Sequence, residues 1–188
     1  MSSLTVQALP ATGLWNIDSN HSSARFSVRH HAVATFRGGF SDITGSYDAE
    51  TGRLIGEVRV DRAELQGLDR LKAHFLTPDF FDADNHPTLS FESHPIGSDG
   101  DVLTVDGELT LRGVTRPVTA TATVQGPATV RHGDGHISER LGIDLTTTID
   151  RRDYGIEFNS EIAANVLNLG WEVTIEVALE LIGASDAE

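Results

Sequence analysis

The sequence has no cysteine among its 188 residues, and Lys72 is its only lysine. Without cysteine, disulfide scaffolds, thiolate metal sites and cysteine nucleophiles are excluded. A chain of this length still buries roughly 70% of the surface that its unfolded form exposes, so it can fold without a bridge or a metal. The length favours a single domain.

Basic residues are also scarce: 14 basic side chains stand against 28 acidic ones, which leaves a formal charge of −14. Such a charge repels nucleic-acid phosphates and anionic lipid surfaces at long range. We therefore expect neither a nucleic-acid partner nor stable membrane insertion.

A secretory signal and a membrane span are missing too. Residues 1–24 contain no Lys or Arg, and polar residues and Pro10 interrupt their apolar stretches. No window approaches the ~20 apolar residues of a membrane-spanning helix. We expect a cytoplasmic protein with one domain at residues 13–182, between flexible tails at 1–12 and 183–188.

Known catalytic signatures are absent as well, since the sequence contains no G-x-S-x-G elbow, P-loop, G-x-G-x-x-G or H-E-x-x-H motif. The eight histidines suggest a metal site. However, His30 and His31 are neighbours in an expected strand, so their side chains should point to opposite faces. A zinc site takes three or four ligands. We expect no metal, and His21 and His30 remain as weak candidates.

Apolar residues at every second position are what the sequence has in abundance. In the last such run, polar residues alternate with Trp171, Val173, Ile175, Val177, Leu179 and Leu181. Further runs cover residues 24–30, 54–60, 103–111, 118–124 and 141–149, with turn residues between them. This pattern is typical of antiparallel strands with one wet face, and closure into a barrel removes the exposed edges. We predict an all-β fold, an extended antiparallel β-barrel, with Glu172, Glu176 and Glu180 on its solvated exterior.

Two stretches break this pattern. Within residues 67–81, Leu68, Leu71 and Phe75 recur at helical spacing, and Pro78 ends the run. We predict one short helical segment there, lying across a barrel end. Residues 156–169 are expected to form a loop with at most one helical turn.

Most of the phenylalanines lie in the first expected strands or in the helical segment: Phe26, Phe36, Phe40, Phe75, Phe80 and Phe81. If the helix covers a barrel end, these rings should meet there. The residues leave two interpretations open: an ordinary filled core, or a deep apolar pocket, since barrels of about eight strands can hold one small ligand.

Four groups of residues, in order along the chain, resemble the YceI-like family of polyisoprenoid-binding proteins. They are Trp15-Asn16-Ile17-Asp18 with His21-Ser22, Phe26, Val28, His30 and Gly39-Phe40; His74, Asp79 to Ala83, Pro87 and Phe91; Gly107, Leu109-Thr110, Gly113 to Thr115 and Pro117-Val118; and Arg151 with Asp153-Tyr154-Gly155. The resemblance runs from about Trp15 to Leu181.

The resemblance implies a lipocalin-like barrel whose apolar tunnel holds a polyisoprenoid or an isoprenoid-quinone-like lipid. It therefore favours the pocket over the filled core, and it implies a non-enzymatic carrier or store without a catalytic cofactor. Relatives also suggest a homodimer. Many relatives carry a signal peptide, which the start of this sequence does not resemble.

Inward positions of the alternating strands and the helix supply the expected tunnel lining: Phe26, Val28, Phe36, Phe40, Leu71, Phe75, Phe80, Phe81, Leu109, Leu111, Val173 and Ile175. Arg37, Arg151 and Arg152 are candidates for contacts with a polar head group near the tunnel mouth. Arg25 and Arg29 fall on the predicted outer face and are not candidates.

Two other functions stay open. The first is a hydrolase or isomerase that acts on the bound amphiphile through His21, His30 or Asp153. The second is an all-β interaction module with a filled core.

Overall fold

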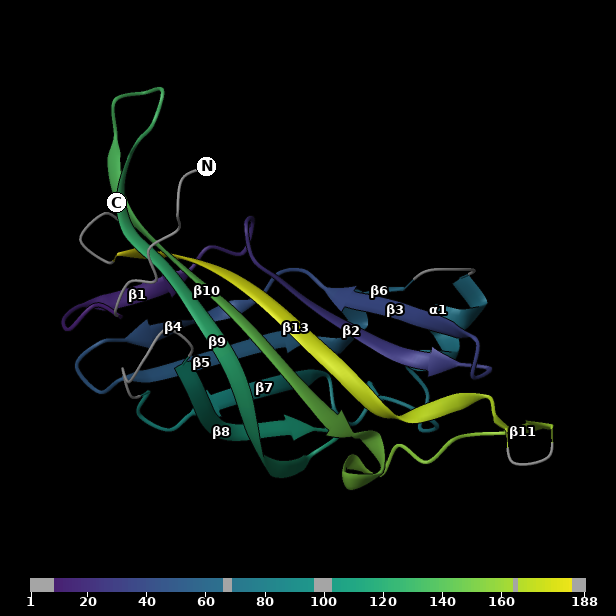
Figure 1. Cartoon of the computed structure of the whole chain (residues 1–188). Coiled ribbons are helices and arrows are strands. Elements are labelled where there is room, and N and C mark those ends of the chain that lie inside the picture. The colour runs from purple at the N-terminus through teal and green to yellow at the C-terminus, as the bar shows by residue number, and fades with distance from the viewer. Residues whose placement is uncertain (1–8, 66–68, 97–102, 164–165, 184–188) are drawn as a thin grey trace.

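The computed structural model describes residues 9–65, 69–96, 103–163 and 166–183. Figure 1 shows a long, twisted barrel crossed by extended strands. The elements are β1 (Leu14–Ile17), β2 (Ser23–His30), β3 (Ala34–Phe40), β4 (Thr44–Asp48), β5 (Arg53–Arg59), η1 (Val60–Arg62), β6 (Ala63–Leu65), α1 (Asp69–Phe75), β7 (Thr88–Ser93), β8 (Leu103–Leu111), β9 (Val114–Arg131), β10 (Ile137–Asp150), η2 (Arg151–Tyr154), β11 (Glu161–Ala163), β12 (Val166–Leu167) and β13 (Leu169–Gly183). The predicted tails fall largely on residues 1–8 and 184–188, which lie outside the described residues.

Eight strands form a closed ring in the order β1-β4-β5-β7-β8-β9-β10-β13, and β13 pairs back onto β1. Every pairing is antiparallel. The prediction of an antiparallel barrel with one short helix is thus confirmed. Strand β8 illustrates the cause, because Leu103, Val105 and Leu109 are buried while Thr104 and Asp106 are exposed.

Strand β13 changes partner along its length. Residues 173–178 pair with β2, whereas residues 181–183 pair with β1. Beyond β2 the sheet continues as β2-β3-β6. In Figure 1, β13 runs in yellow along almost the whole barrel, with β2 and β3 on the side that carries α1.

The barrel end next to β1 is filled by side chains. Trp15, Tyr47, Leu141 and Leu181 are each at most 5% exposed and belong to the buried core there. Register places them together, since Trp15 pairs with Tyr47 across β1 and β4, and Leu141 with Leu181 across β10 and β13. These four side chains are called the plug below.

The helix is shorter than predicted, and its first two predicted residues, 67 and 68, lie outside the described residues. After Phe75 the chain turns instead of continuing as helix: the Phe80 amide donates to the Thr77 carbonyl and the Phe81 amide to the Phe75 carbonyl. The ring of Pro78 disfavours helical geometry at the residue before it. The turn carries Phe80 and Phe81 back toward the barrel.

The segment expected to be a loop also differs from the prediction. Strands β11 and β12 pair within it as a separate two-stranded antiparallel sheet. In Figure 1 this hairpin projects beyond the barrel. Each strand is only two or three residues long, which is too short to produce a clear alternation in the sequence.

The phenylalanine rings meet beside the helix, as predicted. The Phe26 ring lies 6.1 to 6.4 Å from those of Phe36, Phe40, Phe75 and Phe81, measured between ring centroids. These distances fall within the range of favourable aromatic contacts. The cluster joins β2 and β3 to α1 and the turn after it.

Gly38 leaves the space that the Phe26 ring occupies. The two residues are directly paired across β2 and β3, and a Cβ at Gly38 would lie 2.4 Å from Cζ of Phe26. We predict that Gly38→Ala lowers the free energy of unfolding by about 1–3 kcal/mol, because the ring must move against its packed neighbours. Chemical denaturation measures the change.

Gly142→Ala is the matched control, since it also lies in a strand and its Cβ would meet nothing closer than 3.5 Å. It should leave stability unchanged or slightly higher. Equal stability of the two alanine variants would contradict the account of Gly38.

Candidate functional site

An apolar cavity of about 180 Å³ lies inside the barrel, on the side of the plug that faces α1. An apolar cavity of about 150 Å³ is already large enough to take up benzene. Side chains from both walls of the barrel line it, among them Leu54 and Val58 of β5 and Leu145 and Ile149 of β10. The filled core and the hollow barrel therefore coexist, at different levels of one molecule.

Ten of the twelve predicted lining residues face this cavity: Phe26, Val28, Phe40, Phe75, Phe80, Phe81, Leu109, Leu111, Val173 and Ile175. Phe36 and Leu71 do not line it. The Phe36 ring stacks on Phe75, with 5.4 Å between centroids, and so stands behind it. Leu71 lies one helical turn before Phe75 and packs against the core.

Much of the opposite wall was not predicted from the sequence. Leu54, Leu89, Phe91, Leu145 and Leu169 also line the cavity. Leu54 and Leu145 belong to alternating runs that were recognised as strands, so for these two the signal for an inward position was present. What alternation cannot tell is whether an inward side chain meets another side chain or an open space.

Gly56 of β5 lines the cavity without a side chain. It lies between the inward residues Leu54 and Val58, and a Cβ there would have no neighbour within 4 Å. The lack of a side chain at Gly56 contributes directly to the open space.

Three charged residues contact the cavity: Arg25, Glu57 and Arg151. Arg25 is exposed on its strand, as its outward position predicts, although it borders the cavity as well. Glu57 is also exposed, whereas Arg151 is only 4% exposed. The other two head-group candidates, Arg37 and Arg152, are exposed and do not border the cavity.

Arg151 is held in place by the turn that ends β10. Asp150 precedes η2 and accepts a hydrogen bond from the Arg152 amide, and Gly155 ends the turn in the left-handed conformation. Asp150 also pairs with the Arg152 side chain, whose Nε lies 3.0 Å from Oδ1. This turn directs Arg152 outward and Arg151 into the protein.

The Arg151 guanidinium donates to three backbone carbonyls. Its Nε lies 2.8 Å from the Gly170 oxygen, and its Nη1 lies 2.8 and 3.0 Å from those of Ile156 and Phe158. The group also sits 4.4 Å from the centroid of the Trp171 ring. Burial lowers the pKa of Arg151, only partly offset by the charge of Asp150.

The loop that Arg151 holds closes onto the helix. The Phe158 ring lies 5.2 Å from Phe80 and 4.9 Å from His74, measured between centroids. Phe80 in turn stacks on Phe75 at 4.6 Å. The end of the cavity opposite the plug is thus bounded by α1, its following turn and the loop after η2.

The prediction for His30 and His31 was wrong. Their rings stack at 3.8 Å between centroids, because His31 has a φ of 52° and begins the turn after β2 instead of continuing the strand. His21 precedes β2 and His30 ends it, which separates them by roughly 25 Å at about 3.3 Å per residue. The structure therefore does not bring the weak metal candidates His21 and His30 together.

Nor are the residues of the enzyme hypothesis gathered at the cavity. His21 and Asp153 are exposed, and neither they nor His30 are among the described lining residues.

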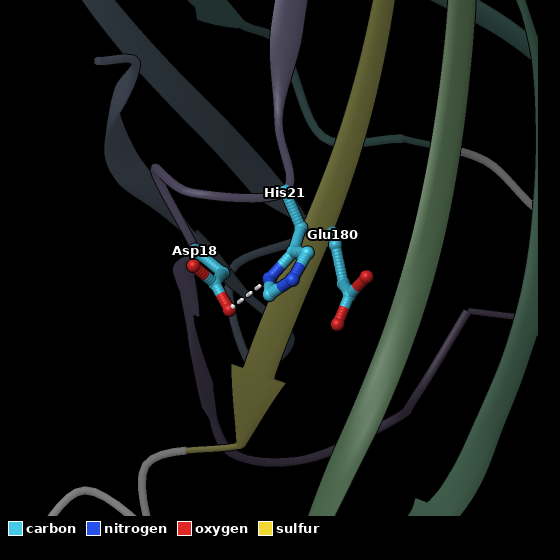
Figure 2. Close-up of side chains that lie close together, drawn as sticks. All are labelled: Asp18, His21 and Glu180. Atoms are coloured by element: carbon cyan, nitrogen blue, oxygen red, sulfur yellow. Dashed lines mark hydrogen bonds and ion pairs between the residues drawn. The ribbon is translucent and has the colours of Figure 1, made fainter.

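His21 does belong to another polar cluster, at the turn between β1 and β2. One ligand atom from each of Asp18, His21 and Glu180 lies within 4.8 Å of the others, a spacing that could suit a metal ion. Figure 2 shows the His21 ring against the Asp18 carboxylate with Glu180 beside them. The His21 Nδ1 lies 2.9 Å from Oδ2 of Asp18.

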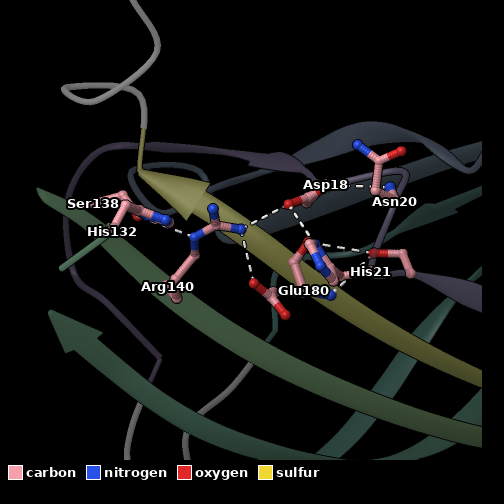
Figure 3. A network of polar contacts seen from close by, with 8 residues as sticks. Asp18, Asn20, His21, His132, Ser138, Arg140 and Glu180 are labelled. Atoms are coloured by element: carbon pink, nitrogen blue, oxygen red, sulfur yellow. Dashed lines mark hydrogen bonds and ion pairs between the residues drawn. The ribbon is translucent and has the colours of Figure 1, made fainter. Parts of the chain in front are cut away.

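Arg140 supplies the positive charge of this cluster. Its Nη1 lies 2.7 Å from both Oδ2 of Asp18 and Oε1 of Glu180, as Figure 3 shows. Its Nε donates to Ser138 Oγ at 3.1 Å. Because a guanidinium already bridges the two carboxylates, the cluster is a structural clamp between the β1–β2 turn, β10 and β13. Glu180, predicted to be simply solvated, is thus part of this clamp.

The clamp perturbs its titratable groups. Burial alone would raise the pKa of Asp18, but hydrogen bonds from His21, Arg140 and the Asn20 amide outweigh it and lower the pKa to about 2. The hydrogen bond with Asp18 raises the pKa of His21. Asp18 is therefore charged at any pH well above 2.

No helix in the described part of the chain has both the length and the apolar composition needed to cross a bilayer.

Comparison with known proteins gives one consistent result. Residues 15–181 match the family model of the YceI-like domain. A UPF0312 protein of Pseudomonas paraeruginosa is 26% identical over 168 residues, which cover 87% of this chain and 85% of the relative. A UPF0312 protein of Pseudomonas putida is 29% identical over 157 residues, or 80% and 79% of the two chains.

Solved structures share the fold. A polyisoprenoid binding domain from Saccharophagus degradans superimposes with a TM-score of 0.70 at 14% identity, covering 90% of this chain and 98% of that one. BcnA of Burkholderia cenocepacia gives a TM-score of 0.67 at 20% identity, covering 87% and 98%. At these sequence identities the likeness shows a shared fold.

The clamp makes stability depend on pH in acid. The folded-state pKa of Asp18 is lowered from its ordinary 3.8 to about 2, so its contribution is present above about pH 4 and is lost as the pH falls toward 2. The free energy of unfolding should fall between pH 6 and pH 2 in both proteins. We predict that this fall is about 2 kcal/mol smaller in Asp18→Asn than in wild type. Urea denaturation of both proteins between pH 6 and pH 2 measures it.

Asp84→Asn, which removes an exposed carboxylate outside the clamp, should keep the wild-type pH dependence. If Asp18→Asn and wild type lost stability in parallel over this range, the clamp would not hold Asp18 as described.

Proposed function

Because the chain belongs to the YceI-like family, we propose that it binds a polyisoprenoid or an isoprenoid-like amphiphile, such as an isoprenoid quinone, inside its barrel. The observation that carries this proposal is the apolar cavity, whose wall is formed almost entirely by hydrocarbon side chains. The fold shared with the Saccharophagus degradans domain, itself a polyisoprenoid binding domain, supports the same class of ligand.

Hydrocarbon burial accounts for affinity in such a cavity. Each CH₂ group removed from water contributes about 0.8 kcal/mol, so the length of the prenyl tail should dominate binding. The aromatic cluster at Phe26 and Phe75 and the aliphatic row of Val173, Ile175 and Val177 supply contact for methyl-branched chains. No ionic chemistry is required for this part of the ligand.

The protein would act as a carrier or store and leave its ligand chemically unchanged. His21, His30 and Asp153 lie outside the cavity wall, which favours binding over the hydrolase or isomerase alternative. The net charge of −14 would keep an otherwise insoluble cargo in solution. A homodimer and a cytoplasmic location stay predictions.

A ligand of this kind should accompany the protein through purification. We predict that organic extraction of purified protein, followed by mass spectrometry, recovers a prenyl-type lipid in a near-stoichiometric amount. An apolar fluorescent dye bound to the delipidated protein should be displaced by geranylgeraniol. Protein that is consistently empty and also fails to bind geranylgeraniol would rule out the carrier.

Gly56 provides a variant that closes the cavity without straining the backbone. The space beside Gly56 is open, so the side chain of Gly56→Leu should occupy the cavity. We predict at least a tenfold loss of geranylgeraniol affinity, because a ligand and the new side chain compete for one volume. The free energy of unfolding should stay equal or rise by up to about 1 kcal/mol, since glycine is unfavourable inside a strand.

Gly133→Leu is the matched control. Gly133 lies between β9 and β10, where a side chain would also have open space, and it does not line the cavity. Its affinity should equal that of wild type. Undiminished binding by a folded Gly56→Leu variant would show that the ligand lies elsewhere.

A further inference from the structure

The Arg151 side chain keeps one nitrogen without a partner. Its Nε and Nη1 donate to backbone carbonyls, but Nη2 is fully enclosed and makes no hydrogen bond. Arg151 is 4% exposed and its side chain borders the cavity, although Nη2 itself lies behind the wall, whose surface is almost entirely apolar. Buried donors are almost always paired in native proteins, so each exception needs an explanation.

The charge of Arg151 is only partly compensated, by the nearby charge of Asp150 and by the face of the Trp171 ring. Its three acceptors are neutral carbonyls, and within the described residues no carboxylate forms an ion pair with it. Asp150, the nearest favourable charge, is already paired with Arg152. A buried cation without a counter-ion is costly, and the apolar cavity wall offers nothing to reduce that cost.

We infer that Arg151 binds the polar end of the ligand through Nη2, and that this end carries an oxygen acceptor, most favourably an anionic one such as a carboxylate. The inference rests on the proposed function and adds the chemistry of the head group to it. This contact requires the guanidinium to turn so that Nη2 reaches the cavity. An oxygen on Nη2 would then satisfy the free N–H groups and compensate the charge in one step. A hydrocarbon would leave Nη2 without an acceptor and the charge without a counter-ion, and Arg151 would repel a cationic head group.

The position of Arg151 also orients the ligand. Arg151 lies at the end of the cavity bounded by η2 and α1, next to Ile156 and Leu169. From there Val173 to Leu179 carry the inward row of β13 toward the plug, a rise of roughly 20 Å at 3.3 Å per residue. The head group therefore lies at the η2 end, with the tail pointing toward Trp15.

A ligand series tests this on the unmodified protein. Geranylgeranoic acid, geranylgeraniol and the prenyl hydrocarbon of equal length compete for one apolar dye, while arginine side-chain NMR follows the Arg151 Nε–H signal. We expect the acid to bind at least tenfold more tightly than the hydrocarbon, with the alcohol between them, because hydrogen bonds to charged groups are the stronger ones. The acid, and not the hydrocarbon, should shift the Arg151 signal.

Three variants test which arginine causes the preference for the acid over the hydrocarbon. Arg151→Met should abolish the preference for the acid, so that the acid and the hydrocarbon bind this variant with equal affinity. Arg152→Gln is the matched control, since this neighbour contacts the same Trp171 ring from an exposed position outside the cavity wall. Arg25→Gln examines the exposed arginine that also borders the cavity. Should Arg151→Met fail to fold, the ligand series and the NMR signal decide.

The outcomes separate the two proposals. Acid and hydrocarbon of equal affinity, or a bound acid that leaves the Arg151 signal unmoved, would overturn the role of Arg151 and leave the lipid-binding function intact. The role of Arg151 would also be overturned if Arg25→Gln lost the preference for the acid while Arg151→Met retained it. Failure of all three compounds to bind would remove both proposals.

Discussion

The shape of the barrel depends on one constraint: along one edge, β13 pairs with two different strands. Its first part pairs with β2 and its last part with β1, while β10 accompanies it on the other edge. Where β1 closes the ring, the interior is narrow enough for the plug to fill. Where β2 takes over, the wall continues into β3 and β6, and residues of β2 such as Phe26 and Val28 line the cavity. The change of partner therefore coincides with the passage from the filled end of the barrel to the cavity.

The point of exchange needs its own support, because β13 has neither partner in register there. Ser22 provides it: its hydroxyl oxygen lies 3.0 Å from the amide nitrogen and 3.3 Å from the carbonyl oxygen of Glu180. The Asp18 amide donates to the same carbonyl. Together with the Arg140 clamp, these bonds connect the closed level of the barrel to the open one. A polar cluster that looks like a metal site by spacing alone is thus explained by strand topology.

The architecture and part of the cavity wall could be predicted from the sequence. Alternation with a period of two identifies inward positions such as Val173 and Leu109, and the clustering of phenylalanines identified the helix end. Alternation gave a wrong prediction, or none, where the local backbone geometry departs from that of a long strand. The positive φ of His31 stacked two rings that alternation places on opposite faces, and the short pair β11–β12 left no periodic signal. Arg151 was one of three arginines named as head-group candidates, but its burial could not be predicted, because it depends on hydrogen bonds to the carbonyls of Ile156, Phe158 and Gly170.

The empty space beside Gly56 has a mechanical consequence. Unfolding eliminates internal voids, and the volume change that hydrostatic pressure acts on scales with them. A barrel with about 180 Å³ of unfilled interior should therefore be sensitive to pressure, and a ligand that filled this volume would reduce that sensitivity. The loaded and unloaded forms would then differ in their response to pressure even where their strands coincide.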